Sequence, residues 1–186
     1  AIETETRFGI GAHFTERREH PVMDRDWSVT HVTDRMKDKA WSQLGTSGSG
    51  NHFVEFGVFT VDRDDLGVPR GKHLALLSHS GSRRTGSEIC DHYSRVALEK
   101  HPELPSEVKH LAWLSLKSGE GQEYWRAMEL MGEYAAANHA CIHRHIAEHL
   151  GAGDDEEPGM SFETARETMV AMMATQAGAL VVVPED

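Results

Sequence analysis

The chain has 186 residues, of which 39% are hydrophobic and 26% are charged, so it is long enough to bury the core of a single soluble domain. Its net charge of −11 excludes the generally basic surface of most nucleic-acid-binding proteins, so any nucleic-acid contact must be local or must come from parts of the protein outside this sequence. No apolar run approaches the roughly 20 residues of a membrane span, and we expect a cytoplasmic protein with no membrane partner.

The first half of the sequence predicts two strands. Residues 1–40 are polar, and we expect only short strands or a loop cover there. A loop rich in glycine and serine ends at Gly50 and leads into a Phe- and Val-rich run at 52–61 that predicts a strand. Residues 62–71 have turn chemistry, and 72–78 predict a second strand that pairs with the first.

The second half predicts helices. One begins near Ser87 and ends at His101, and a short one follows Pro105. The clearest helix covers 122–150 and is capped by Gly151. Its apolar residues recur at spacings of three and four: Tyr124, Met128, Met131, Ala135, Ile142 and Ile146.

The last part of the sequence, together with the elements before it, gives the predicted fold class. Residues 161–176 predict a helix, and the apolar run 179–183 predicts a buried strand. We therefore expect one α/β (α+β) domain over 1–186, with a mixed sheet and flanking helices. The start at Ala1 and the strand close to the other end suggest truncation at both ends. Two cysteines without CxxC spacing are expected to be buried free thiols, Cys90 and Cys141.

The first candidate site is the sequence GSGNHFVE at 48–55. Glycines let the backbone turn sharply and expose N–H groups that can hold a phosphate. Asn51 can both donate and accept hydrogen bonds, and His52 is held at the start of a strand. The alternative is a plain turn, which is what most such loops are.

The second candidate site is the sequence HSGSR at 79–83, between a strand and a helix. Its hydroxyls, the Arg83 guanidinium and the helix N-terminus suit an anion, although a helix-capping loop with a surface arginine is the alternative. If the strands are neighbours, His52 and His79 meet at their ends. Two imidazoles on rigid strands suit Mn²⁺ or Zn²⁺, and the other ligands must then come from elsewhere.

The long helix adds two pairs of histidines spaced four residues apart, His139 with His143 and His145 with His149. Each pair shares a helix face and could hold a metal ion, but no carboxylate completes a HExxH pattern, so we favour histidines on a polar face. Asn138 falls on the apolar stripe. A buried Asn needs partners, so it either supports the site or bonds to a neighbouring loop.

Two motifs resemble the RtcB family of RNA ligases. LGTSGSGNHFVEF at 44–56 and LLSHSGSR at 76–83 are similar to the family's LGTxGxGNHFxE and HSGSR motifs. The helical sequence at 120–142 resembles a later family helix, Y-x2-M-x2-A-x2-YA-x2-NR. The resemblance covers roughly residues 40–150 and leaves 151–186 unassigned.

The resemblance implies a ligase that uses GTP and Mn²⁺. Family members join an RNA 3′-phosphate, or a 2′,3′-cyclic phosphate, to a 5′-hydroxyl in tRNA splicing and RNA repair, through a guanylylated histidine. By position, the resemblance assigns Mn²⁺ binding to His52 and His79, guanylate binding to Asn51, Phe53 and Glu55, and an RNA-phosphate contact to Arg83.

The sequence also departs from the family pattern. The upstream DVHxGxG and GVDIGCGM motifs are absent, as are the downstream His-Asn motif and the HGAGR motif that carries the guanylylated histidine. Two metal ligands and the nucleophile are therefore missing, no catalytic residue is assigned, and we expect the chain to be inactive alone. Arg84 replaces the usual Gly after HSGSR, and His139 replaces the usual Arg after Asn138.

Two other functions are compatible with the same residues. One is a stand-alone metal- or nucleotide-binding module without catalysis. The other is a structural remnant in which the histidines only satisfy the fold.

Overall fold

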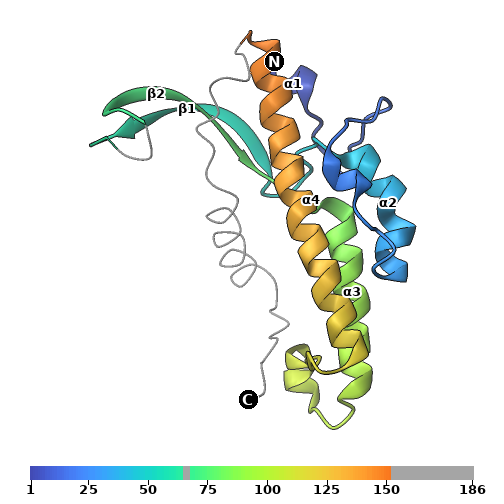
Figure 1. Ribbon diagram of the computed structural model, residues 1–186. Helices are drawn as coiled ribbons and strands as arrows, with labels where there is room; N and C mark the ends of the chain where they lie inside the picture. The colour runs from blue at the N-terminus through green and yellow to red at the C-terminus, as the bar shows by residue number, and fades with distance from the viewer. Residues whose placement is uncertain (65–67, 152–186) are drawn as a thin grey trace.

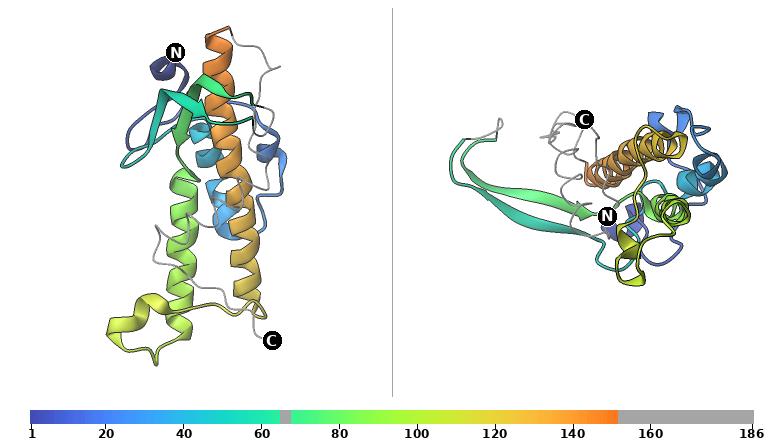
Figure 2. Two further views of the ribbon diagram at one scale, coloured as in Figure 1. Left: turned by 90° about the vertical axis from the view of Figure 1, so that its left-hand side faces the viewer. Right: turned by 90° about the horizontal axis from the view of Figure 1, so that it is seen from below.

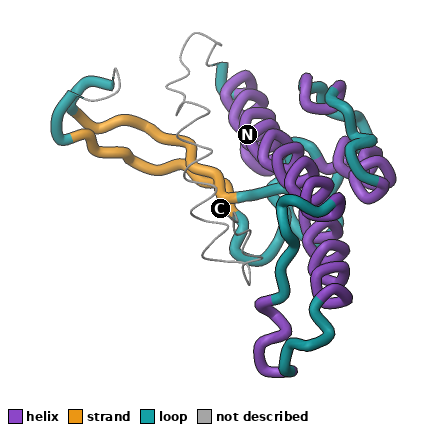
Figure 3. The backbone as a smooth tube through the Cα atoms, turned by 60° about the horizontal axis from the view of Figure 1, so that its bottom comes forward, coloured by secondary structure: helices purple, strands orange, loops and turns teal. Residues whose placement is uncertain are grey.

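The computed structural model of the protein describes residues 1–64 and 68–151. Helices form the body, and a β-hairpin projects from one side of them (Figures 1 and 3). The predicted combination of helices and strands is confirmed. The helix and strand predicted at 161–176 and 179–183 lie outside the described residues. In chain order the elements are α1 (Ile2–Glu5), the 3-10 helix η1 (Pro21–Asp24), α2 (His31–Gln43), β1 (Phe53–Val61), β2 (Gly71–His79), α3 (Arg83–Lys100), the 3-10 helix η2 (Ser106–Leu111) and α4 (Gly119–His149).

The hairpin confirms both predicted strands to within one residue. β1 and β2 pair antiparallel, from Phe53 opposite His79 to Val61 opposite Gly71. Antiparallel pairing places the start of β1 and the end of β2 together at the base of the hairpin, against the helices (Figure 1). The outer part extends away from the helices and exposes large apolar side chains, among them Val58, Phe59, Leu74 and Leu77.

The main core lies among the helices. α3 runs away from the hairpin and α4 returns beside it in the opposite direction, while α2 packs against α3 (Figures 1 and 2). The Tyr134 hydroxyl of α4 donates a 2.8 Å hydrogen bond to the Ala40 carbonyl of α2, and the Tyr134 ring packs edge-on against Trp27. The apolar spacing of α4 therefore serves this core, which also contains Val32, Leu44, Ile89, Tyr93, Ala127 and Leu130.

A second, smaller core holds the base of the hairpin on α4. Val54 of β1 packs with Ile142 and Ile146 of α4, and Leu76 of β2 lies against them. This contact covers the inner end of the hairpin only, so the site at its base is fixed to α4.

The prediction of short strands or a loop cover for residues 1–40 was wrong where α1, η1 and most of α2 are helical. The sequence does carry a signal for α2. Val32, Met36 and Ala40 recur every fourth residue on its inner side, which is a helical spacing. Thr30 and Thr33 form a reciprocal capping box that starts the helix. Ile10, expected in a short strand or loop cover, lies in a loop and is 96% exposed.

The helical boundaries differ from prediction where loops meet helices. α3 begins at Arg83, four residues before the predicted start, so part of the HSGSR motif is helical. The short helix after Pro105 is a 3-10 helix, and Gly151 has the positive φ of 75° expected of a helix cap. Both cysteines are free thiols, but only Cys141 is buried as predicted, whereas Cys90 is partly exposed. None of the helices in the described ranges is long and apolar enough to cross a bilayer.

Candidate functional site

The two candidate loops meet at the base of the hairpin. His52 directly precedes β1, and His79 is the last residue of β2, so the antiparallel register brings them to the same end. Their ring centroids are 5.6 Å apart. The prediction that the strand ends bring these two imidazoles together is confirmed.

Asn138 of α4 fixes both loops. It is fully buried, and its side-chain oxygen accepts a 2.7 Å hydrogen bond from the Gly45 backbone N–H. Its amide nitrogen donates to the Thr46 carbonyl and to the Ser80 hydroxyl, both at 3.1 Å. The Ser80 hydroxyl in turn donates to the Ser47 carbonyl at 2.7 Å. The two predicted roles of Asn138, bonding to a neighbouring loop and supporting the site, therefore coincide, because it supports the site by bonding to its loops.

Hydrogen bonds hold the His52 ring through one of its two nitrogens. Its Nδ1 lies 2.8 Å from the Ser47 carbonyl, which can only accept, and 3.2 Å from the Arg83 guanidinium, which can only donate. The shorter contact favours the tautomer with the proton on Nδ1, which leaves a lone pair on Nε2. Burial lowers the pKa of His52, as do the nearby Arg83 and His79, although the bond to Ser47 opposes them. A neutral imidazole held through its other nitrogen is the form in which histidine binds metals.

Arg83 lies beside His52 as the first residue of α3. It has a positive φ of 56°, and its guanidinium donates to the Thr46 hydroxyl at 3.0 Å and lies 3.2 Å from His52 Nδ1. The guanidinium packs on Gly48, where a Cβ would lie only 1.8 Å from Nη1. Among the described residues, no carboxylate forms an ion pair with Arg83. The site thus keeps a half-buried positive charge that an anion can neutralise.

The three residues predicted to hold guanylate lie around the start of β1. Phe53 and Glu55 alternate with buried Val54 and so share the face of the hairpin that points away from α4. The Phe53 ring stacks on His79 at 5.8 Å, and 39% of Phe53 is exposed. Asn51 is exposed in the bend before β1. The structure therefore places Phe53 against His79, with Asn51 and Glu55 two residues away on either side of it along the chain.

His139 and His143 do not lie on a solvated polar face. The Ser78 hydroxyl is 2.6 Å from His139 Nδ1 and 2.9 Å from His143 Nε2, so both rings point at β2. Burial lowers the pKa of His139 to about 4, and the neighbouring histidines add to the effect. The interpretation of His139 and His143 as histidines on a polar face was therefore wrong. Nothing in the sequence indicates that the Ser78 side chain of β2 is directed at α4.

The second pair of histidines lies further along α4. His145 Nδ1 is 3.4 Å from Glu148, and His149 Nδ1 is 3.1 Å from Glu5 of α1, so each faces a carboxylate. Within the described part of the chain, no three His, Cys, Asp or Glu side chains are arranged around one metal position. Among these residues His52 and His79 are therefore a pair without a third such side chain, and the histidine pairs of α4 do not form a separate centre.

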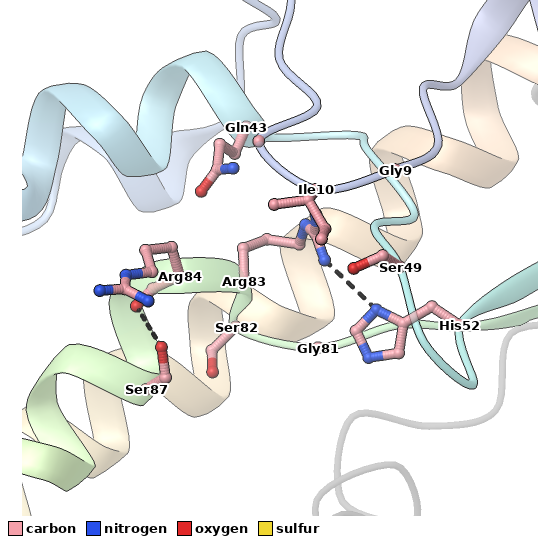
Figure 4. A pocket seen from close by; sticks show the side chains of 11 residues that line it. Gly9, Ile10, Gln43, Ser49, His52, Gly81, Ser82, Arg83, Arg84 and Ser87 are labelled. Atoms are coloured by element: carbon pink, nitrogen blue, oxygen red, sulfur yellow. Dashed lines mark hydrogen bonds between the residues drawn. The ribbon is translucent and has the colours of Figure 1, made fainter.

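A pocket of about 400 Å³ opens beside this cluster (Figure 4). Arg83 and Arg84 at the start of α3 form one side of it, and Gln43 at the end of α2 forms another. His52 lies at its edge, next to the Arg83 guanidinium (Figure 4). The remaining lining consists of Gly9, Ile10, Gly11, Ser49, Gly81, Ser82 and Ser87.

The N-terminal part of this lining is held by backbone hydrogen bonds. The Gly9 N–H donates to the Gly48 carbonyl at 2.7 Å, and the Ser47 N–H donates to the Arg7 carbonyl at 3.0 Å. The first loop of the chain is thereby joined to the glycine-rich loop. Sequence reasoning had assigned no role to this first segment.

Comparison with known proteins agrees with the two motifs. The family model described as "tRNA-splicing ligase RtcB" matches residues 3–170. The chain belongs to the RtcB family. The match is wider than the range 40–150 that the motifs indicated, and it includes the N-terminal loop that lines the pocket.

Several curated relatives share this family. The tRNA-splicing ligase RtcB of Methanocaldococcus jannaschii is 34% identical over 133 residues, which is 67% of this chain and 13% of the relative. That of Methanococcus maripaludis is 34% identical over 157 residues, covering 80% of this chain and 32% of the relative. That of Aeropyrum pernix is 32% identical over 161 residues, again 80% and 32%. The chain thus spans about a third or less of the length of these relatives.

Proposed function

We propose that this chain is part of an RNA ligase that uses GTP and Mn²⁺ to join an RNA 3′-phosphate, or a 2′,3′-cyclic phosphate, to a 5′-hydroxyl. The observation that carries the proposal is the juxtaposition of His52 and His79 beside Arg83, which pairs with no carboxylate in residues 1–64 and 68–151. Family membership, and relatives named tRNA-splicing ligases, support RNA as the substrate.

In this proposal the two histidines are ligands of Mn²⁺. Such an ion neutralises phosphate charge and orients the attacking oxygen when it is bound. The Ser47 carbonyl fixes the His52 ring so that Nε2 is available, and Phe53 stacks on the His79 ring and limits its rotation. Anchoring both loops to Asn138 keeps the rings at a set separation before any ligand arrives.

The same proposal assigns the guanylate to the outer face of the hairpin base. Asn51 would contact its phosphate, and Phe53 and Glu55 would bind the guanine. A carboxylate can accept hydrogen bonds from a guanine edge, and a partly exposed aromatic ring offers a stacking surface. Arg83 would contact an RNA phosphate from the pocket side, where its charge lies next to His52.

We further propose that the isolated chain binds these ligands without ligating. His52 and His79 give only two metal ligands, and the sequence lacks the HGAGR motif that holds the nucleophile in the family. Self-guanylylation of the purified 186 residues with GTP and Mn²⁺ would contradict this part of the proposal.

The proposal is tested by calorimetric titration of Mn²⁺ into the purified chain, with and without GTP. We expect saturable binding that is lost in both His52→Ala and His79→Ala, because each removes one of two ligands of the same ion. His110→Ala is the matched control, since His110 is exposed in η2, far from the hairpin base. Retained binding in either site variant would exclude a shared metal site.

The titration also separates the other two functions. Suppose that the chain binds Mn²⁺ and GTP independently of each other and does not bind RNA ends. This result would indicate a stand-alone binding module. A folded chain that binds neither Mn²⁺ nor GTP would indicate that the histidines serve the fold alone. Retention of the far-ultraviolet circular dichroism spectrum in each variant shows that the chain is folded.

A further inference from the structure

One buried polar atom at the pocket has no hydrogen-bond partner among the residues that the structure describes. Gln43, the last residue of α2, is 2% exposed, and its side-chain nitrogen donates a 3.2 Å hydrogen bond to the Ala12 carbonyl. Its side-chain oxygen accepts no hydrogen bond from any described residue. Buried oxygens without a donor are rare in folded proteins, and one at the wall of a pocket indicates that a ligand supplies the donor.

The side chain of Gln43 is directed at the pocket. It forms part of the lining, and Figure 4 shows it pointing from α2 towards the side that carries Arg83 and Arg84. The bond to Ala12 identifies the nitrogen of the Gln43 side-chain amide, because only the nitrogen can donate to a carbonyl. The oxygen is therefore the end left for a ligand.

The opposite side of the pocket is prepared for an anion. Arg83 and Arg84 are the first two residues of α3, where positive charge is unfavourable because the helix dipole is positive at that end. The N-cap residue Ser82 makes no side-chain capping hydrogen bond, and no acidic residue lies in the first turn. The first N–H groups of the helix thus lack a capping side chain. A bound anion would satisfy them and offset both arginines.

The positive charge of Arg84 is only partly neutralised by an ion pair. It pairs with Glu88 one turn along α3, and its side chain is 61% exposed. Arg83 forms no ion pair with a carboxylate in the described ranges. The two guanidiniums and Glu88 leave a net positive charge at this end of the helix, although the whole chain carries −11.

A ligand of this pocket must therefore carry an anion and, a few bonds away, a hydrogen-bond donor. An RNA 3′ end has this arrangement, because its 3′-phosphate and its 2′-hydroxyl are attached to neighbouring carbons. We propose that the pocket binds the terminal nucleotide of a 3′-phosphorylated RNA, with the phosphate against Arg83, Arg84 and the α3 N-terminus and the 2′-hydroxyl donating to the Gln43 side-chain oxygen. This inference rests on the proposed function and makes Gln43 the residue that distinguishes RNA from DNA ends.

The test measures binding of three small ligands to the full chain by calorimetry: adenosine 3′-monophosphate, its 2′-deoxy form and its 2′-deoxy-2′-fluoro form. Fluorine is close to hydroxyl in size but donates no hydrogen bond. We expect the ribose form to bind about five- to tenfold more tightly than either of the others, as the loss of one buried hydrogen bond predicts. Equal affinity for the three ligands would overturn the role of Gln43 while leaving the phosphate site intact.

Two variants assign the preference to one side chain. Gln43→Met keeps the volume but removes the acceptor, and it should lower the ribose preference to about one without weakening the deoxy ligand. Gln122→Met is the matched control, since Gln122 is an exposed glutamine whose side-chain nitrogen also donates to a backbone carbonyl, that of Leu116. A ribose preference retained in Gln43→Met would sink the inference.

Failure of the proposed function has a different signature. If adenosine 3′-monophosphate and its two analogues all fail to bind the folded chain, the phosphate site itself is absent and both proposals fall. The ligand comparison is made on the unaltered chain, so the outcome does not depend on whether Gln43→Met folds.

Discussion

The side-chain oxygen of Asn138 accepts a 2.7 Å hydrogen bond from the backbone N–H of Gly45, across 93 residues of sequence. The same amide donates to Thr46 and Ser80, so one side chain in α4 holds both loops of the site. The position of His52 relative to His79 is therefore set from a helix that carries neither of them.

Replacement of Asn138 should destabilise the protein as a whole. Asn138→Leu leaves the Gly45 N–H buried without its acceptor and takes one of two donors from the Thr46 carbonyl, and we expect the free energy of unfolding to fall by about 2–4 kcal/mol. Urea denaturation measures the change. Asn51→Ala, at an exposed position, serves as the control and should alter stability by less than about 0.5 kcal/mol. A similar small change in Asn138→Leu would show that the loops are held by other contacts.

The bond between Ser80 and Asn138 should appear as a coupling energy. Ser80 accepts from Asn138 and donates to Ser47, so Ser80→Ala and Asn138→Leu remove parts of the same network. We expect the double variant to lose about 1 kcal/mol less than the sum of the two single losses. Additive losses, measured in the same denaturation series, would mean that the two side chains act independently.

Gly48 should resist substitution because of Arg83. Its φ of 105° disfavours any side chain, and the added Cβ of Gly48→Ala would overlap the Arg83 guanidinium. We expect a loss of about 1–3 kcal/mol in stability and a clear loss of phosphate affinity, because Arg83 must leave its place beside His52. Gly57→Ala is the comparison, since a Cβ there meets nothing within 4 Å. Equal effects at the two glycines would exclude a specific contact.

Stability should fall with pH between about 6.5 and 4. Burial lowers the pKa of His139 to about 4 from 6.5, so in this range the unfolded chain binds a proton at His139 that the folded chain does not. The stability contributed by a neutral His139 is complete above 6.5 and is lost progressively below it, by up to about 3 kcal/mol at pH 4. Urea midpoints from pH 7.5 to 4.5, in buffer with a metal chelator, measure the loss.

The slope of stability against pH, compared between variants, assigns this loss to one residue. His139→Gln cannot take up the proton, so its stability should depend less steeply on pH than that of the unaltered chain. His110→Gln, altered at an exposed histidine, should keep the original slope. An unchanged slope in His139→Gln would place the titrating group elsewhere, for instance at His52, whose pKa is also lowered by burial.

The hairpin and its two histidines could be predicted because the signal is local. The Phe- and Val-rich run, the turn residues and the second strand follow one another, and antiparallel pairing then brings His52 to His79. The long helix was equally clear from the spacing of Tyr124, Met131 and Ile142, all of which are buried.

The remaining parts of the site depend on contacts between distant segments. Neither the orientation of Ser78 towards His139 nor the unpaired oxygen of Gln43 has a sequence pattern of its own. Arg83 was placed in a loop, because its role as the first residue of α3 depends on a backbone φ of 56° that arginine rarely adopts. The sequence indicated that Asn138 needs hydrogen-bond partners, but it did not indicate which residues those partners are.

The anchoring of the loops on α4 also determines when the site can form. The hairpin closes through contacts between neighbouring strands, so the two histidines can meet early in folding. Asn138 lies 58 residues beyond Ser80, and during synthesis it leaves the ribosome well after the hairpin is complete. The bonds that join the two loops can therefore form only once α4 has docked, which places completion of the candidate site after closure of the hairpin.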